Sequence, residues 1–314
     1  MRLCMKIGML FPPQGSQFVG MGKELYDNSR IMQEYFEEAS SCLDINFVKL
    51  CFASSDAEIN GLNNAYTSLF LVSSALWAVL KDRDVQPDIV LGYNAGEYAA
   101  LHAAGSLSLP DGLYLLNKYA TLYQELLSDL DVSVLRITGS SSKIIEKACK
   151  DTSSKKEFVH IAVYESATQH IVAGHTPAVV RLSDVVRREN GIKIKNESIA
   201  IGLHSPLMQP VVASIKMYLE KIDFKDATIP IITNADAQKT SSGDDIKEKV
   251  IAQFHQPVLL VQSMELLAEC DLVIEVGPGK QMTSLFNQRY PDIQTVAINT
   301  KSDLEQLQMI LGEE

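Results

Sequence analysis

One stretch, DIVLGYNAGEYAALHAA at residues 88–104, constrains the fold more than any other. The apolar run 88–91 predicts a short buried strand, and the residues from 96 onward predict an apolar helix. Only GYNAG separates the two, and a glycine stands at each end of that turn. A strand that passes through so tight a turn directly into a helix is typical of a parallel sheet covered by helices.

The flanking sequence continues the same alternation. A short apolar strand is predicted at 5–11, and it ends at the turn PPQGSQ. Helical periods are found at 22–39, 65–82 and 107–127, and towards the end of the chain a strand, a helix and a strand are predicted at 229–233, 258–269 and 272–276.

The middle of the chain has a different pattern. Strands are predicted at 132–138, 159–163 and 170–174, with helices at 143–151 and 178–189. This order resembles β-α-β-β-α-β, a ferredoxin-like unit. We therefore predict a large domain formed by residues 1–131 and 199–314, with a small domain inserted at 132–198.

Charge separates the predicted small domain from the rest of the chain. The whole chain has a formal net charge of −11, which argues against nucleic acid as a partner. Residues 132–198 contain 11 Lys and Arg against 7 Asp and Glu, so this segment is basic within an acidic protein. Such a segment suits an anionic partner, or it is an ordinary solvated face.

The sequence predicts no membrane segment and no metal site. The longest apolar run, at 69–80, is interrupted by Ser73 and Ser74 and is too short to span a bilayer. The apolar opening residues meet Pro12 and Pro13 without a small-residue cleavage site, so no signal peptide is expected. The five cysteines are scattered without a CxxC pair, which favours reduced thiols and a cytoplasmic location over zinc or disulfides.

Asn94 stands at the tip of the turn, where a nucleophile elbow has its reactive residue. Such tips usually have a positive φ, which Asn tolerates better than most residues. A neutral amide is, however, a poor nucleophile and cannot carry an acyl ester. Further along the chain, His204 in GLHSPLM could be a general base or a structural histidine.

Six blocks in order along the chain are similar to the malonyl-CoA:acyl-carrier-protein transacylase family, which includes the acyltransferase domains of polyketide synthases. They are FPPQGSQFVGMGKELY (11–26), GYNAGEYAALHAAGSLSLPDGL (92–113), HIVAGHTPAVV (170–180), LHSPLMQP (203–210), QPV (256–258) and EVGPGKQMTSL (275–285). The resemblance covers nearly the whole chain. It implies an α/β fold with an α/β-hydrolase-like large domain, built on a parallel sheet, and an inserted ferredoxin-like small domain.

The resemblance also implies a mechanism. In this family an elbow serine attacks the malonyl thioester of coenzyme A, and a histidine takes its proton. The malonyl group then moves to the phosphopantetheine thiol of an acyl carrier protein, so no cofactor is expected beyond these substrates. By motif, His204 is the base and the carbonyl of Gln253 orients its ring. The N–H groups of Gln14 and Ala95 are the oxyanion donors, and Asn234 lines the site.

The chain departs from the family pattern at several of these positions. The family motif GHSxGE is GYNAGE here, so Tyr93 and Asn94 replace its histidine and its nucleophilic serine. The arginine that binds the malonyl carboxylate becomes Tyr119, and a phenol cannot replace a bidentate guanidinium. A glutamine usual before the apolar helix becomes Thr67, and Pro13 replaces a glycine before Gln14.

Three functions are compatible with this pattern. The first is a non-catalytic homologue that binds an acyl carrier protein or a polyketide synthase module through basic residues of 132–198. The second is a thioester hydrolase in which His204 activates water. The third is acyl transfer by a route that the motifs do not reveal. The sequence alone does not separate fatty acid from polyketide synthesis.

Overall fold

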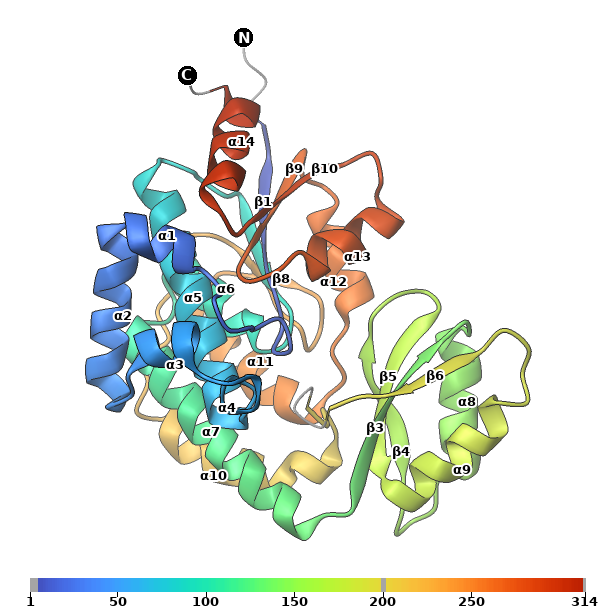
Figure 1. Ribbon diagram of the computed structural model, residues 1–314. Helices are drawn as coiled ribbons and strands as arrows, with labels where there is room; N and C mark the ends of the chain where they lie inside the picture. The colour runs from blue at the N-terminus through green and yellow to red at the C-terminus, as the bar shows by residue number, and fades with distance from the viewer. Residues whose placement is uncertain (1–4, 199–201, 313–314) are drawn as a thin grey trace.

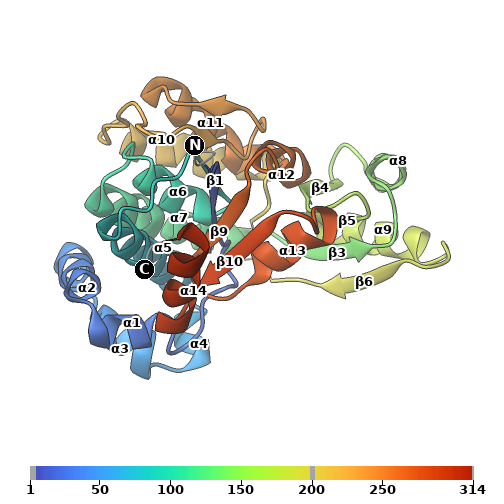
Figure 2. The ribbon, with the colours of Figure 1, turned by 90° about the horizontal axis from the view of Figure 1, so that it is seen from above.

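The computed structural model describes residues 5–198 and 202–312, and its larger part contains a six-stranded sheet (Figure 1). The strand order is β10-β9-β1-β2-β7-β8, and all neighbours are parallel except β7 and β8. Helices lie on both sides of this sheet (Figure 2), so its central strands are buried along their whole length. The strands are β1 (Ile7–Phe11), β2 (Ile89–Gly92), β7 (Ile231–Ile232), β8 (Lys239–Thr240), β9 (Leu272–Val276) and β10 (Gln294–Ile298).

The helices of this part pack into one large apolar core with the sheet. In 5–198 and 202–312, no helix is long and apolar enough to cross a membrane. The helices are α1 (Lys23–Asn28), α2 (Arg30–Leu43), α3 (Phe47–Ala53), α4 (Asp56–Ile59), α5 (Leu62–Asp82), α6 (Gly96–Ala103), α7 (Leu109–Asp129), α10 (Gln209–Leu219), α11 (Gly243–His255), α12 (Leu260–Leu267), α13 (Gln281–Arg289) and α14 (Lys301–Leu311).

A second sheet, entirely antiparallel, is built from the middle of the chain and stands beside the larger part (Figure 1). Its order is β4-β5-β3-β6, with two helices packed on it around a separate apolar core. The chain order is β3 (Val132–Thr138), α8 (Ser142–Thr152), β4 (Val159–Tyr164), β5 (Gln169–His175), α9 (Thr176–Val186) and β6 (Lys193–Asn196). This is the predicted β-α-β-β-α-β order. The division into domains stays our proposal, and its boundary at 199 lies outside the described residues.

Most predicted helices are found with their ends shifted by up to three residues, and two of the differences have a clear physical cause. The helix predicted over 22–39 is interrupted at Ser29, which is extended (φ −127°, ψ 117°). Its hydroxyl accepts a hydrogen bond from the N–H of Met32 and so caps α2, which is a new helix. The helix predicted over 258–269 begins two residues late, because Val258 is extended and forms a bridge with Val163.

That bridge joins the second sheet through its backbone to the segment before α12. Val163 of β4 pairs in parallel with Val258, and the Val258 N–H donates to the Ala162 carbonyl at 2.9 Å. The Tyr164 N–H donates in turn to the Val258 carbonyl at 3.0 Å. The next residue, Leu259, donates its N–H to the carbonyl of Asn234 in the large part.

Candidate active site

The predicted turn after β2 has the geometry of an elbow. Asn94 is its tip, with φ 53°, the left-handed region expected there. Both flanking glycines are required by close packing. A Cβ on Gly92 would lie 2.1 Å from the Gly96 carbonyl oxygen, and one on Gly96 would lie 2.4 Å from that of Phe11. The first turn of α6 therefore lies directly against the ends of β1 and β2.

Asn234, in the loop after β7, clamps this elbow. Its Oδ1 accepts from the N–H of Asn94 at 2.9 Å, and its Nδ2 donates to the carbonyl of Gly92 at 2.5 Å. Its own N–H donates to Glu97 Oε1 at 3.0 Å. Burial raises the pKa of Glu97 to about 8, so this carboxyl is largely protonated at neutral pH. Both ends of the Asn234 side-chain amide are therefore used to hold the turn.

His204 lies beside the tip, in the loop before α10. Its Nδ1 donates to the carbonyl of Gln253 at 2.8 Å, and its Nε2 lies 2.9 Å from Asn94 Nδ2. Since a carbonyl can only accept, the proton is on Nδ1, and the amide of Asn94 donates to Nε2. Gly202 is packed so close that a Cβ there would lie 2.8 Å from Nε2. The ring of His204 is thus oriented as that of a general base would be. Its basic nitrogen, Nε2, already accepts a hydrogen bond from Asn94.

Of the two backbone N–H groups expected to bind an oxyanion, that of Ala95 already has a hydrogen-bond partner. The N–H of Ala95 donates to Gln14 Oε1 at 3.2 Å, and both residues are buried. Ala95 could therefore receive a substrate oxygen only after the side chain of Gln14 moves. The structure brings Gln14 and Ala95 together, but as partners of each other.

A small cavity of about 20 Å³ lies in front of the tip. That volume has room for about one water molecule. Tyr93, Asn94 and Gln14 line it, together with two charged residues of the second sheet, Arg136 and Glu165.

Arg136 and Glu165 are site residues that the motifs did not indicate. Glu165 is 3% exposed; its Oε2 accepts from Arg136 Nη1 at 2.6 Å, and its Oε1 accepts from the hydroxyl of Tyr93 at 3.1 Å. Arg136 Nε donates to Glu197 Oε1 at 2.9 Å. Burial raises the pKa of Glu165, and Arg136 opposes that rise. One signal was available: a lone arginine inside the apolar strand VSVLRIT requires a buried partner.

Tyr119 and Thr67, two predicted substrate-binding residues, are not among the residues that line the cavity. Tyr119 is buried, stacks on Phe254 with ring centres 4.8 Å apart, and packs against Tyr66 and Tyr123 at 5.4 and 5.7 Å. Burial raises its pKa. The hydroxyl of Thr67 donates to the carbonyl of Asn63, one turn earlier in its helix. The place where the resemblance expects the carboxylate anchor is thus packed aromatic core.

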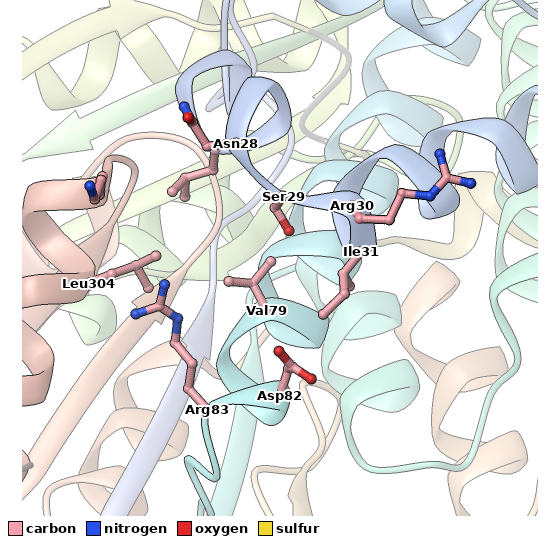
Figure 3. A pocket seen from close by; sticks show the side chains of 10 residues that line it. Asn28, Ser29, Arg30, Ile31, Val79, Asp82, Arg83 and Leu304 are labelled. Atoms are coloured by element: carbon pink, nitrogen blue, oxygen red, sulfur yellow. The ribbon is translucent and has the colours of Figure 1, made fainter.

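A larger hollow of about 550 Å³ lies between α1, α2, α5 and α14 (Figure 3). Arg30, Asp82 and Arg83 line it, and Leu304 forms its apolar side. None of the predicted site residues lines this hollow. The chemistry expected from the motifs therefore belongs to the small cavity at Asn94.

Comparison with known proteins gives the family and the fold. Residues 9–308 match the acyl transferase domain family. The chain is 33% identical to the malonyl CoA-acyl carrier protein transacylase of Bacillus subtilis, over 98% of each chain. The structure is similar to that of FabD from Acinetobacter baumannii, with a TM-score of 0.92, 28% identity and 99% of each chain covered. It is also similar to a malonyl-transacylase solved in complex with a type II polyketide synthase acyl-carrier protein (TM-score 0.91, 26% identity, 96% of this chain and 98% of that chain).

Proposed function

The chain belongs to the acyl transferase domain family, and from this premise we propose that it does not form an acyl-enzyme and acts by binding an acyl carrier protein or a synthase module. It is a homologue of malonyl-CoA:acyl-carrier-protein transacylases of fatty acid and polyketide synthesis. The proposal concerns what this homologue has kept of their activity.

One observation carries the proposal. The residue at the elbow tip is an amide, and its Nδ2 donates to the nitrogen of His204 that a nucleophilic serine would use. Asn94 cannot carry an ester, and its hydrogen bond occupies the base. Two further contacts support the same conclusion: Gln14 occupies the N–H of Ala95, and Tyr119 is part of an aromatic core.

Binding of a carrier protein is supported by charge. The helices of the second sheet expose a group of cations: Lys143, Lys147 and Lys150 on α8, and Arg187 and Arg188 after α9. No ion pair of these five side chains is found among the described residues. Carrier proteins are typically acidic, so this basic face, defined by those five residues, suits them.

The first test is intact-mass spectrometry after incubation with malonyl-CoA and with acetyl-CoA. We expect no adduct on the wild type, and an acetyl adduct on Asn94→Ser, because the hydroxyl would then face His204. The double variant Asn94→Ser/His204→Ala is the control and should stay unmodified. An adduct on the wild type would overturn the proposal and would indicate transfer by another nucleophile.

The second test measures binding of an acyl carrier protein by titration calorimetry at two salt concentrations. Lys143→Glu/Lys147→Glu should weaken binding about tenfold, and the loss should shrink at high salt. Lys216→Glu/Lys221→Glu, at two exposed lysines on and just after α10, is the control matched in charge. Equal affinity of the two variants would exclude the basic face as the docking surface.

A thioester hydrolase is the second candidate, and the bond from His204 Nδ1 to the Gln253 carbonyl favours it. His204 Nε2 would activate water once the Asn94 amide, which donates to it, has moved aside. Turnover of acetyl-CoA or malonyl-CoA above that of His204→Ala would support this candidate. Equal rates in the two proteins would exclude it.

A further inference from the structure

We propose that Arg136 and Glu165 make this site accept a phosphopantetheine arm that ends in a free thiol and reject the same arm when it is acylated. The inference rests on the proposed carrier-protein binding and names the form of the carrier that is bound. It assigns a selective role to two residues of the second sheet.

The cavity at the elbow is too small for an acyl group. The cavity at the elbow measures about 20 Å³ and has room for about one water-sized group. A thiol sulfur is a little larger than a water molecule, whereas an acetyl group adds three heavy atoms and a malonyl group adds six. Enlarging the cavity would require Glu165 to move, but its two oxygens accept from Tyr93, Arg136 and Gln169.

The charge of Arg136 is already balanced by two carboxylates. An arginine at the cavity could in principle bind the carboxylate of a malonyl group. Here Arg136 Nη1 and Nε already donate to Glu165 and Glu197, at 2.6 and 2.9 Å. An incoming carboxylate could bind bidentately only by displacing one of these, because each bidentate edge of a guanidinium includes Nε or Nη1, and a displaced Glu165 would be left as a buried, unpaired charge. The malonyl arm should therefore be rejected more strongly than the acetyl arm.

A groove beside Glu165 offers a path for the arm. A groove of about 400 Å³ lies between the turn that joins β4 to β5 and the helices α12 and α13. Val261, Met264 and Leu285 give it an apolar floor, and Ser166 lies on its rim. Glu165 lines both this groove and the cavity at Asn94. Such a mixed lining suits the methylene and amide groups of a pantetheine arm, and Glu165 stands where its end would arrive.

The test compares one bacterial acyl carrier protein in four forms: without the arm, with the free thiol, S-acetylated and S-malonylated. We expect the free-thiol form to bind about tenfold more tightly than the malonylated form, with the acetylated form between them. Equal binding of the thiol and acyl forms would overturn the inference. Equal binding of the forms with and without the arm would overturn it as well, since the arm would then not enter.

A variant sharpens the test. Glu165→Gln keeps the shape of the side chain and removes the negative charge that pairs with Arg136, so the malonylated form should gain most and the thiol form least. Glu157→Gln is the matched control, because Glu157, in the loop before β4, pairs with Arg181 of α9 at 2.9 Å at the surface. If no form of the carrier binds the wild type, the proposed function fails first. If all forms bind alike, only the selectivity fails.

Discussion

Two regions of the site differ in what holds them together. Around the elbow, Asn94, His204, Gln253 and Asn234 form a polar framework in which each group is hydrogen-bonded to another. Around Tyr119, the side chains form an aromatic cluster without a charged group. The polar framework fixes the backbone geometry of the elbow through its hydrogen bonds. The aromatic cluster instead contributes apolar packing between helices.

Tyr119→Arg would break this comparison most strongly. If the anchor region were still a ligand pocket, the arginine would be tolerated and malonyl binding would return. We expect instead a loss of about 3–5 kcal/mol of stability, because the guanidinium would be buried among aromatic rings. Urea denaturation measures the loss, and Tyr119→Phe is the control that keeps the ring. A fully stable arginine variant would show that the cluster is not core.

Asn234→Ala tests the polar framework. The change leaves the N–H of Asn94 and the carbonyl of Gly92 buried without their partner. We expect a cost of about 2–3 kcal/mol in the free energy of unfolding. Asn287→Ala, on the exposed side of α13, removes one hydrogen bond to Thr295 and should cost much less. Equal costs would mean that the clamp contributes nothing special to the elbow.

Glu97→Gln sharpens the comparison, since Glu97 is the titrating group within the polar framework. Its pKa is raised from 4.5 to about 8, first by burial. The unfolded chain loses this proton near pH 4.5 and the folded chain only near pH 8, so the wild type loses stability as the pH rises between them. The variant should match the wild type near pH 4 and exceed it by about 3 kcal/mol at pH 7. Thermal unfolding across this range measures the difference, and a constant offset would contradict the raised pKa.

Tyr93→Phe gives the smallest expected effect. It removes the hydroxyl that donates to Glu165 but leaves Arg136 and Gln169 as partners of that carboxylate. We expect a loss of about 1 kcal/mol. Chemical denaturation measures it, with Tyr290→Phe, at a partly exposed ring, as the comparison. A loss as large as that of Asn234→Ala would place Tyr93 within the polar framework.

The sequence predicted those parts of the site that depend on local pattern. The strand, turn and helix around Asn94 follow from apolar periods and two glycines, and the positive φ follows from the turn. The fold class was also predicted, because alternating strands and helices leave few arrangements, and the relatives share it. The motif resemblance named His204 and Gln253, which the structure brings together at 2.8 Å.

The remaining features depend on contacts between segments far apart in the chain. The pairing of Arg136 with Glu165 joins β3 to the turn after β4 beside the elbow, and no local period encodes it. The side chain of Gln14 on the N–H of Ala95 is a rotamer choice set by the packed cavity. The break at Ser29 was missed because the apolar period continues through it, whereas the cap is a single hydroxyl.

The backbone bridge between Val163 and Val258 has a consequence for how this molecule moves and melts. The second sheet shares hydrogen bonds with Val258 across the bridge, and the next residue, Leu259, donates its N–H to the carbonyl of Asn234. The second sheet therefore cannot swing away as an independent lobe without breaking main-chain bonds that lead to the elbow. Ligands would be admitted by side-chain rearrangement rather than hinge opening. Heating should unfold both sheets in a single cooperative transition, despite their separate apolar cores.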